Sequence, residues 1–172
     1  MTIDEFVALM ESTAPPAPPD QIEAFEAEVG ATLPDDYRKF LVRTNGGYIP
    51  GWYRFKGPTP DGQSWVAFVH HVCGLREEPH LSLRFNRACG LSGESQFPRA
   101  LLWIMDDPGG NGICLGLGGK RRGRVYFWIH DEQPDPEEWD GEVETARNVI
   151  LLADSFTEFI AGVGPRSEGD DE

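Results

Sequence analysis

The stretch IEAFEAEVGATLPDDYRKFLVRTNGG, residues 22–47, predicts two short helices that meet at a leucine–proline corner. In its first half, apolar residues recur at spacings of three and four, the period of a helix with one buried face: Ile22, Phe25 and Val29. The side chains between them are acidic and are expected to face solvent: Glu23, Glu26 and Glu28. Gly30 ends this helix, because glycine readily adopts the left-handed conformation that closes one.

The second helix of this stretch carries signals at both ends. Leu33 precedes Pro34, and proline fits the first helical position because its missing N–H has no partner to lose there. Two aspartates follow, which the positive end of the helix dipole favours. The expected buried face is Tyr37, Phe40 and Leu41. The residues expected to form the C-cap, because they tolerate positive φ, are Asn45, Gly46 and Gly47.

Residues 1–19 are expected to form a short helix and a hinge in front of the main domain. Thr2 and Glu5 have the spacing of a capping box. The run APPAPP, residues 14–19, cannot continue a helix and predicts a semi-rigid spacer, so the first helix is expected to lie on the body as an appendage. We therefore divide the chain into residues 1–19, a main domain at 20–164 and an acidic, disordered tail at 165–172.

The middle of the chain has the composition of strands. The clearest runs are separated by Gly- and Pro-rich turns and span residues 65–72, 100–105, 113–117 and 124–130. Residues 100–105, ALLWIM, are continuously apolar, which predicts a central strand covered on both faces. In the last run, Val125 and Phe127 alternate with Tyr126 and Trp128, so the two pairs are expected on opposite faces. Strands spaced so closely predict an antiparallel meander.

Three further segments complete the expected fold. Residues 77–94 are polar and are expected to form a long loop with one helical turn, and the acidic run 131–142 is expected to end the sheet. A last helix begins at Ser155, with Phe156 and Phe159 on its apolar stripe. Helices, then antiparallel strands, then a closing helix predict an α+β fold whose helices pack on one face of the sheet.

The net charge bears on the kind of partner. The chain of 172 residues has 15 Lys and Arg against 29 Asp and Glu, a formal charge of −14 at pH 7. A phosphate backbone requires a basic surface, so nucleic acid is not expected as a direct ligand. A basic protein partner is electrostatically favoured, since opposite fields accelerate encounter, and acidity for solubility alone is the competing interpretation.

Cysteine spacing and hydropathy predict a reduced, soluble protein. Cys73, Cys89 and Cys114 are odd in number and share no CxxC spacing, which disfavours both a disulfide framework and a zinc site. Acidic residues interrupt the first dozen positions, where a signal sequence needs a basic flank and an apolar core. The apolar runs are all shorter than the ~18 residues of a membrane span. We expect a cytoplasmic protein that contacts no membrane.

Two glycine-rich segments superficially resemble ligand-binding loops. Residues 116–120 fail the phosphate-loop pattern, which needs Gly where Cys114 stands and Ser or Thr where Arg121 stands, and are expected to form a hairpin turn. Residues 106–112, DDPGGNG, lack the ligand spacing and terminal Glu of a calcium loop. We expect a turn there, in which Gly110 accepts positive φ and side chains such as Asn111 satisfy exposed amides.

Histidine and cysteine positions predict neither a metal site nor a catalytic set. His70 and His71 are neighbours on a predicted strand and are therefore expected on opposite faces, unable to bind one ion together. His80 and His130 show no metal-ligand spacing with them. Cys73 is the nearest approach to a nucleophile beside a histidine, but an apolar strand cysteine is usually inert. We expect no cofactor, no metal ion and no catalytic residue.

The strongest candidate for a partner-binding surface is the acidic segment, residues 131–144, DEQPDPEEWDGEVE. It carries eight acidic side chains and no Lys or Arg. A solvated loop is the plain interpretation, but we favour interaction, because such charge resembles a polyanion in the basic cleft of a nuclease. Trp52 and Trp139 are candidate anchors, although tryptophan more commonly packs beneath a loop. The candidate contact residues are Asp131, Glu132, Asp135, Glu137, Glu138, Trp139, Asp140 and Trp52.

Several motifs together resemble the Smi1/Knr4 family of the SUKH superfamily, over about residues 20–162. They are LPDDYRKFL followed by NGG (33–47), FPRALLWI (97–104), GGNGICLGL (109–117), VYFWIHD (125–131) and ADSFTEFI (153–160). Each is weak alone, and their order and spacing carry the specificity. The residues that we assign to the fold of this motif set are Leu33, Pro34, Tyr37, Phe40, Leu41, Asn45, Gly46, Gly47, Gly110, Asn111, Trp128, Phe156 and Phe159.

The resemblance implies a SUKH-like binding module without catalytic residues. Bacterial members resemble immunity proteins that neutralise a toxin, often a nuclease, and fungal members resemble regulators of cell-wall synthesis. We therefore predict an immunity protein that binds a cognate, basic toxin by stoichiometric contact. The alternative is an intracellular regulatory or scaffold module unrelated to toxins, and an enzyme using Cys73 or a histidine is a third class. Residues 77–95, longer than a minimal member needs, are a second place where partner choice would reside. The toxin's identity and the oligomeric state stay open.

Overall fold

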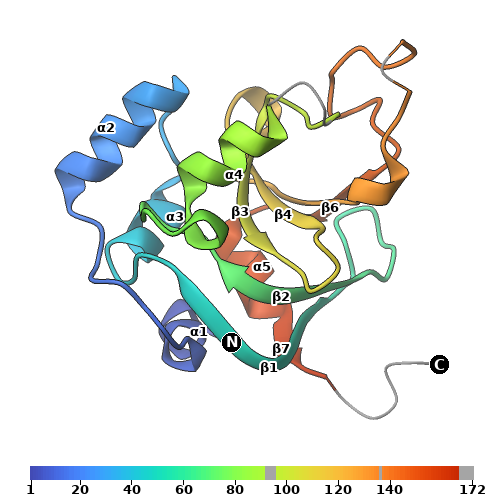
Figure 1. Ribbon diagram of the computed structural model, residues 1–172. Coiled ribbons are helices and arrows are strands. Elements are labelled where there is room, and N and C mark those ends of the chain that lie inside the picture. The colour runs from blue at the N-terminus through green and yellow to red at the C-terminus, as the bar shows by residue number, and fades with distance from the viewer. Residues whose placement is uncertain (92–95, 136, 167–172) are drawn as a thin grey trace.

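The computed structural model describes residues 1–91, 96–135 and 137–166, and within these ranges the chain combines five α-helices with a seven-stranded antiparallel sheet (Figure 1). The helices are α1 (Ile3–Leu9), α2 (Pro19–Val29), α3 (Asp35–Leu41), α4 (Leu83–Gly90) and α5 (Phe156–Gly162). The predicted α+β class is confirmed. The predicted disordered tail lies, from residue 167 on, outside the described residues.

The sheet is wider than the sequence predicts. Its strands are β1 (Gly47–Lys56), β2 (Val66–Val72), β3 (Leu101–Asp106), β4 (Gly112–Gly116), β5 (Val125–Trp128), β6 (Val149–Ala153) and β7 (Val163–Pro165). Their spatial order is β6-β5-β4-β3-β2-β1-β7, so β1 to β6 form the predicted meander. The prediction that the acidic run ends the sheet is wrong. The chain returns as β6, whose apolar residues pair antiparallel with β5.

Helix α5 joins the two edges of the sheet. β6 lies at one edge and β7 at the other, yet little more than α5 separates them in sequence. A helix of seven residues spans only about 10 Å, so the sheet must curl to bring its edges close. In Figure 1, α5 crosses behind the strands. Asp36 of α3 binds the first turn of α5. Its carboxylate accepts hydrogen bonds from the Thr157 N–H at 3.0 Å and from the Thr157 hydroxyl at 3.2 Å.

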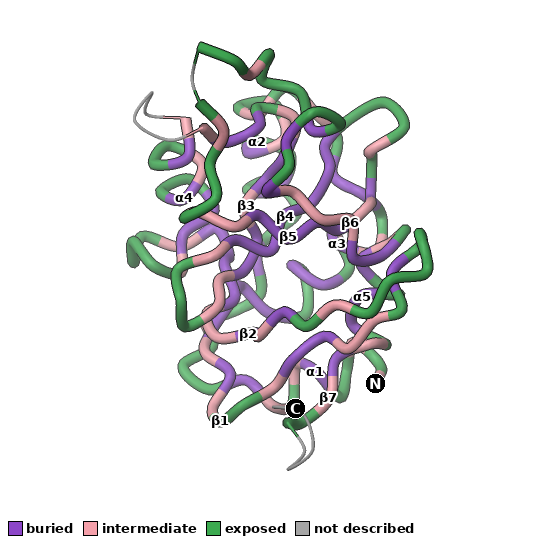
Figure 2. Tube along the Cα trace, turned by 90° about the vertical axis from the view of Figure 1, so that its right-hand side faces the viewer, coloured by how far each residue is buried: buried purple, intermediate pink, exposed green. Residues whose placement is uncertain are grey.

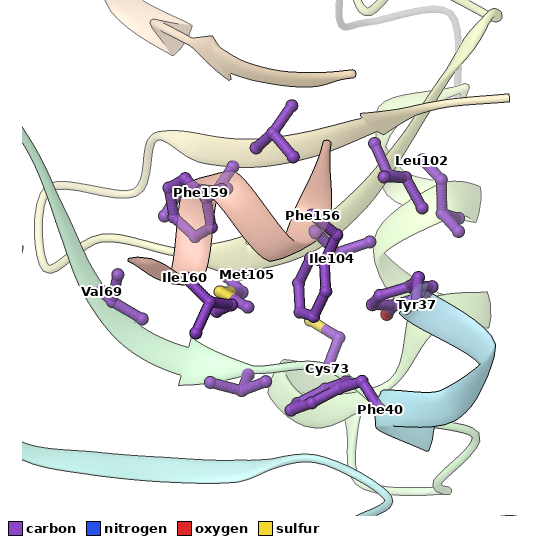
Figure 3. Packing of buried hydrophobic residues seen from close by; sticks show 14 of the residues in the cluster. Tyr37, Phe40, Val69, Cys73, Leu102, Ile104, Met105, Phe156, Phe159 and Ile160 are labelled. Atoms are coloured by element: carbon purple, nitrogen blue, oxygen red, sulfur yellow. The ribbon is translucent and has the colours of Figure 1, made fainter. Parts of the chain in front are cut away.

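The larger of two apolar clusters fills the space between the sheet and the helices. All five helices contribute to it, through residues that include Phe6, Ile22, Tyr37, Leu83 and Phe156. Figure 3 shows its centre, where the side chains of α5 lie among those of α3 and of the strands. Phe6 is fully buried there, so α1 contributes to the same core as the main domain.

A smaller cluster covers the opposite face of the sheet. On β5, Val125 and Phe127 belong to the larger cluster, whereas Tyr126 and Trp128 belong to the smaller one, which confirms the predicted alternation. Phe97 and Val143, from connecting segments, complete the smaller cluster. Figure 2 shows the resulting pattern, with buried residues concentrated on the strands and exposed residues on the connections. The helices therefore pack mainly on one face, and connecting segments together with the C-terminal end of α4 close the other.

A carboxylate fastens the corner between α2 and α3. α2 ends at Gly30, whose φ of 71° is left-handed, as predicted. The expectation that Glu26 faces solvent is wrong, since its side chain is only 11% exposed. Its Oε1 accepts the Leu33 N–H at 2.7 Å, and its Oε2 lies 3.1 Å from the Arg38 guanidinium. The chain reverses direction here and leaves the Leu33 N–H without a backbone partner, which Glu26 supplies.

α3 ends earlier than predicted, and Asn45 has another role than capping. Val42 is the C-cap, and among the three expected cap residues only Gly46 has a positive φ, of 79°. The Asn45 side chain instead bonds both backbone groups of Leu75. A Cβ added at Gly46 would lie 2.4 Å from the Val72 carbonyl oxygen, so only glycine allows this close approach of the two chains.

The segment predicted as a long loop contains a regular helix. A 3-10 turn at Pro79–Leu81 leads into α4, and the Ser82 hydroxyl caps α4 by accepting the Phe85 N–H at 3.3 Å. Leu83 is fully buried in the larger cluster. The sequence conceals this helix because only a few apolar residues are set among many polar ones. The rest of the segment, residues 92–95, is outside the described part of the chain.

Candidate partner-binding surface

The acidic segment connects β5 to β6 at one edge of the sheet, and all of it except residue 136 is described. Its own side chains fold it into turns. The Asp135 carboxylate accepts the Glu137 N–H at 2.9 Å, and the Asp140 carboxylate accepts the Glu142 N–H at 3.0 Å. Figure 1 shows the segment in orange, projecting beyond the sheet. These local hydrogen bonds give the segment a defined shape.

Trp139 stands between two hollows on this side of the molecule. The first has a volume of about 580 Å³ and is lined by Phe97, Arg99 and Arg121 among others. The second has a volume of about 440 Å³ and is lined mainly by the acidic segment itself. The Trp139 side chain lines both and is half-buried, and its Nε1–H donates to the Glu142 carbonyl at 3.0 Å. It therefore forms part of the wall that the two hollows share.

The acidic side chains of the segment fall into two groups. Glu142 and Glu144 are held by Arg121, whose Nη2 lies 2.6 Å from an oxygen of each. This hydrogen bonding by Arg121 lowers the pKa of Glu144 to about 2. The second group consists of four exposed side chains, Glu132, Asp135, Glu137 and Glu138. In the described part of the chain, no Lys or Arg nitrogen lies within 4.0 Å of their carboxylates. These four charges act outward rather than within the fold.

Trp52, the other proposed anchor, lies apart from the acidic segment. It is on β1, and β2, β3 and β4 separate β1 from β5 in the sheet. Its side chain is 53% exposed, packs edge-on against Phe68 at a centroid distance of 5.4 Å, and lies 5.7 Å from the Arg166 guanidinium. The structure therefore brings seven of the eight proposed contact residues onto one surface and places the eighth elsewhere.

A cluster that the sequence analysis excluded lies at the junction of β2 and β3. The ring centroids of His70 and His71 are 4.1 Å apart. The Asp106 Oδ1 lies 3.0 Å from Nδ1 of His71 and 3.9 Å from Nδ1 of His70. One possible ligand atom from each of the three residues lies within 4.8 Å of the other two. The prediction that the two histidines point to opposite faces, and so cannot approach one ion together, is wrong.

An irregularity in β1 explains this convergence. The pairing of β1 with β2 shifts between Tyr48 and Tyr53, so residues 49–52 lie opposite His70 alone. A bulge of this kind increases the local twist and breaks the alternation of side chains. Asp106, at the end of β3, also accepts the His71 N–H at 3.0 Å. Burial, reinforced by the neighbouring His71, lowers the pKa of His70, and burial raises the pKa of Asp106.

The nearby cysteine is not activated. Cys73 is fully buried, and the Asn86 amide lies 3.0 Å from its sulfur. Burial raises the pKa of the Cys73 thiol and likewise that of Cys114, so both stay protonated at neutral pH. Cys89 is exposed.

The comparison with known families covers most of this structure. The sequence model of the SMI1 / KNR4 family (SUKH-1) matches residues 16–162, which include the α2–α3 corner, β1 to β6 and α5. The chain belongs to the SMI1/KNR4 family. The match confirms the resemblance found in the sequence and also spans the acidic segment and the histidine cluster. Membership of the SMI1/KNR4 family fits a binding protein of the immunity type.

A relative of this SMI1/KNR4 protein is known by sequence. The chain is 27% identical over 159 residues to the SPbeta prophage-derived uncharacterized protein YokK of Bacillus subtilis (strain 168), covering 82% of this chain and 71% of that protein. Because that relative is itself uncharacterised, the similarity adds no activity. Among the described helices, none has the length and apolar character needed to cross a membrane.

The contacts that sequence reasoning missed are tertiary. Nothing local to Asn45 indicates that its amide binds Leu75, and nothing in the pair His70–His71 indicates that both rings meet Asp106. The one sequence signal for the second case is Pro50 followed by Gly51 inside the β1 run, since these residues mark a bulge when they interrupt a strand.

Proposed function

We propose that this SMI1/KNR4 family member is an immunity protein, which binds a cognate toxin in the cytoplasm of the producing cell and blocks it by stoichiometric contact. The observation that supports this most directly is the exposed acidic surface beside Trp139, where four carboxylates have no Lys or Arg nitrogen within 4.0 Å among the described residues. The protein acts without turnover.

The geometry of the acidic segment suits capture of a basic surface. Arg121 neutralises Glu142 and Glu144 and so anchors the base of the segment, while the outward carboxylates stay available. Opposite fields raise association rates, and a toxin inside its own producer must be captured fast. Trp139, between the two hollows, supplies the large apolar contact that commonly dominates binding energy at the centre of an interface. Contact by this side of the molecule therefore combines steering with an anchor.

The test begins with the genes encoded beside this one: if one of them encodes a large secreted protein, its C-terminal domain is produced and tested as the toxin. We would measure its association with the purified chain by surface plasmon resonance at several salt concentrations. In the first variant, Glu132, Glu137 and Glu138 are replaced by lysine. The matched control makes the same charge change at exposed positions elsewhere, with lysine at Glu11, Asp20 and Glu23.

Comparison of the two triple variants separates the effect of charge on the acidic segment from the effect of the net charge of the whole chain. We expect the first variant to associate at least about tenfold more slowly and with weaker salt dependence, and the control to change the rate far less. Trp139→Ala should chiefly accelerate dissociation, by roughly 30-fold for a loss of about 2 kcal/mol. Equal rates for both triple variants would remove the acidic segment from the interface. Absence of a toxin gene nearby, together with a partner of another class, would support the regulatory or scaffold role.

A further inference from the structure

We propose that His70, His71 and Asp106 form a binding site for a divalent transition-metal ion of the zinc type, at the junction of β2 and β3. This inference is independent of the proposed toxin binding. It rests on the convergence of two imidazole rings and one carboxylate, which the β1 bulge produces and which neither the family nor the relative assigns.

The ligand set matches the chemistry of zinc and its neighbours. Two imidazole nitrogens and a carboxylate oxygen are ligands that Zn²⁺, Co²⁺ and Ni²⁺ accept, with bonds of about 2.0–2.2 Å. The separations from Asp106 Oδ1 are 3.0 Å to His71 and 3.9 Å to His70. Two ligands of one tetrahedral ion lie roughly 3.3–3.5 Å apart at such bond lengths. Because all three ligand atoms lie within 4.8 Å of one another, small rotations of the His70 and His71 side chains would bring them to these separations.

The surroundings orient the ligands and leave them open to solvent. Each histidine side chain is 30% exposed and that of Asp106 is 17% exposed, so an ion can enter from solution. The Tyr48 ring packs edge-on against His70 at a centroid distance of 4.9 Å, and the His71 N–H fixes Asp106 from the other side. The His80 ring stacks on His71 at a centroid distance of 6.1 Å and packs against the cluster, and a water molecule would supply the fourth ligand.

An ion at this place would clamp a weak point in the sheet. β2 and β3 share a single register pair, Val72 with Met105, supplemented by the Cys73 N–H donating to the Ile104 carbonyl at 2.9 Å. The metal ligands come from both of these strands. Binding to the folded state alone should therefore stabilise the protein and hold β2 against β3.

The experiment titrates the chelator-treated full chain with Zn²⁺, by isothermal calorimetry and native mass spectrometry, and follows the melting temperature. We expect one ion per chain, a dissociation constant in the micromolar range or below, and a higher melting temperature. His70→Gln and His71→Gln should each weaken binding at least about tenfold. His130→Gln and Cys89→Ser are the matched controls, a histidine and an exposed thiol outside the cluster, and should leave binding unchanged.

Two measurements on the unmodified chain keep the proposal testable if a variant fails to fold. Co²⁺ should give the visible bands of nitrogen and oxygen coordination without the intense near-ultraviolet band of a cobalt thiolate. Paramagnetic broadening by Co²⁺ in an amide NMR spectrum should centre on residues 70, 71 and 106. Binding only in the millimolar range, a thiolate band that Cys89→Ser removes, or broadening centred elsewhere would overturn the site.

Discussion

The side chain of Asn45 pairs with the backbone of Leu75 as a neighbouring strand would. Its Oδ1 accepts the Leu75 N–H at 2.6 Å and its Nδ2 donates to the Leu75 carbonyl at 3.2 Å. Both residues are buried, so water cannot replace either bond. A single amide therefore connects the end of the two-helix corner to the segment that follows β2.

Asn45→Ala should lower the free energy of unfolding by about 1–3 kcal/mol, because it leaves both backbone groups of Leu75 buried without a partner. Urea denaturation measures this loss. Asn86→Ala is the matched control, since Asn86 is also buried but within the described part of the chain its amide donates only to the Cys73 sulfur. A loss for Asn45→Ala no larger than that of the control would contradict this assignment.

Gly74→Ala should be at least about 3 kcal/mol destabilising, the upper part of the range for overpacking. An added Cβ would lie 2.2 Å from the Asn45 carbonyl oxygen, a backbone atom that cannot move without separating the two segments. Gly118→Ala meets no atom within 4 Å and has an extended φ of −155°, so it should be neutral or stabilise slightly. Urea midpoints of the two variants test the contrast, which similar values would refute.

The Arg121–Glu144 pair should make stability depend on acidity in a defined window. The pKa of Glu144 is lowered from 4.5 in the unfolded chain to about 2 in the folded chain. The ion pair therefore adds its full stabilisation to the folded state above pH 4.5, and this stabilisation is lost as the pH falls through about 2. Because Glu144 is 38% exposed, we expect only about 0.2–1 kcal/mol. Carbon-detected NMR titration of the carboxyl group should show the low pKa, and Arg121→Gln should raise it.

The stability difference between the unmodified chain and Arg121→Gln should accordingly be constant at neutral pH and shrink toward pH 2. Arg147→Gln removes a nearby exposed guanidinium that holds no carboxylate in the described structure and serves as control. A pKa of Glu144 that both substitutions leave near 2 would show that Arg121 is not its cause.

Thiol labelling should distinguish the three cysteines. Cys89 is exposed, whereas Cys73 and Cys114 are buried thiols whose pKa burial raises. We expect one label per native chain from iodoacetamide and three in denaturant, read by mass spectrometry, and a native label on Cys89 that Cys89→Ser abolishes. Rapid native labelling of Cys73 at neutral pH would revive the hypothesis of a nucleophilic enzyme.

The elements that the sequence predicts well are those with a strong local period. The stripe of Ile22 and Phe25, the stop at Gly30 and the alternation along β5 all reflect which side chains one segment must bury. The sequence does not predict β6, because its apolar run VILLA is only five residues long and lies between an acidic loop and the last helix, and its pairing with β5 decides that it is a strand.

The candidate sites divide in the same way. The acidic segment is visible in the sequence because charge is a property of composition, yet which carboxylates Arg121 neutralises depends on how the loop folds back. The convergence of His70 and His71 contradicts simple alternation, because a bulge in a neighbouring strand overrides the local rule. For Glu26 the sequence predicts exposure and the structure shows burial. Its position on α2 would face solvent in an isolated helix, but the chain turns back after the helix and places the Leu33 N–H against its carboxylate.

The strap formed by β6, α5 and β7 has a consequence for synthesis. Phe156 and Phe159 pack against Tyr37, Phe40 and Phe55, which are translated far earlier. Those earlier aromatic side chains stay uncovered until the strap has left the ribosomal tunnel. A nascent chain stalled before residue 156 should therefore recruit chaperones, and the finished core should assemble only after translation has passed the strap.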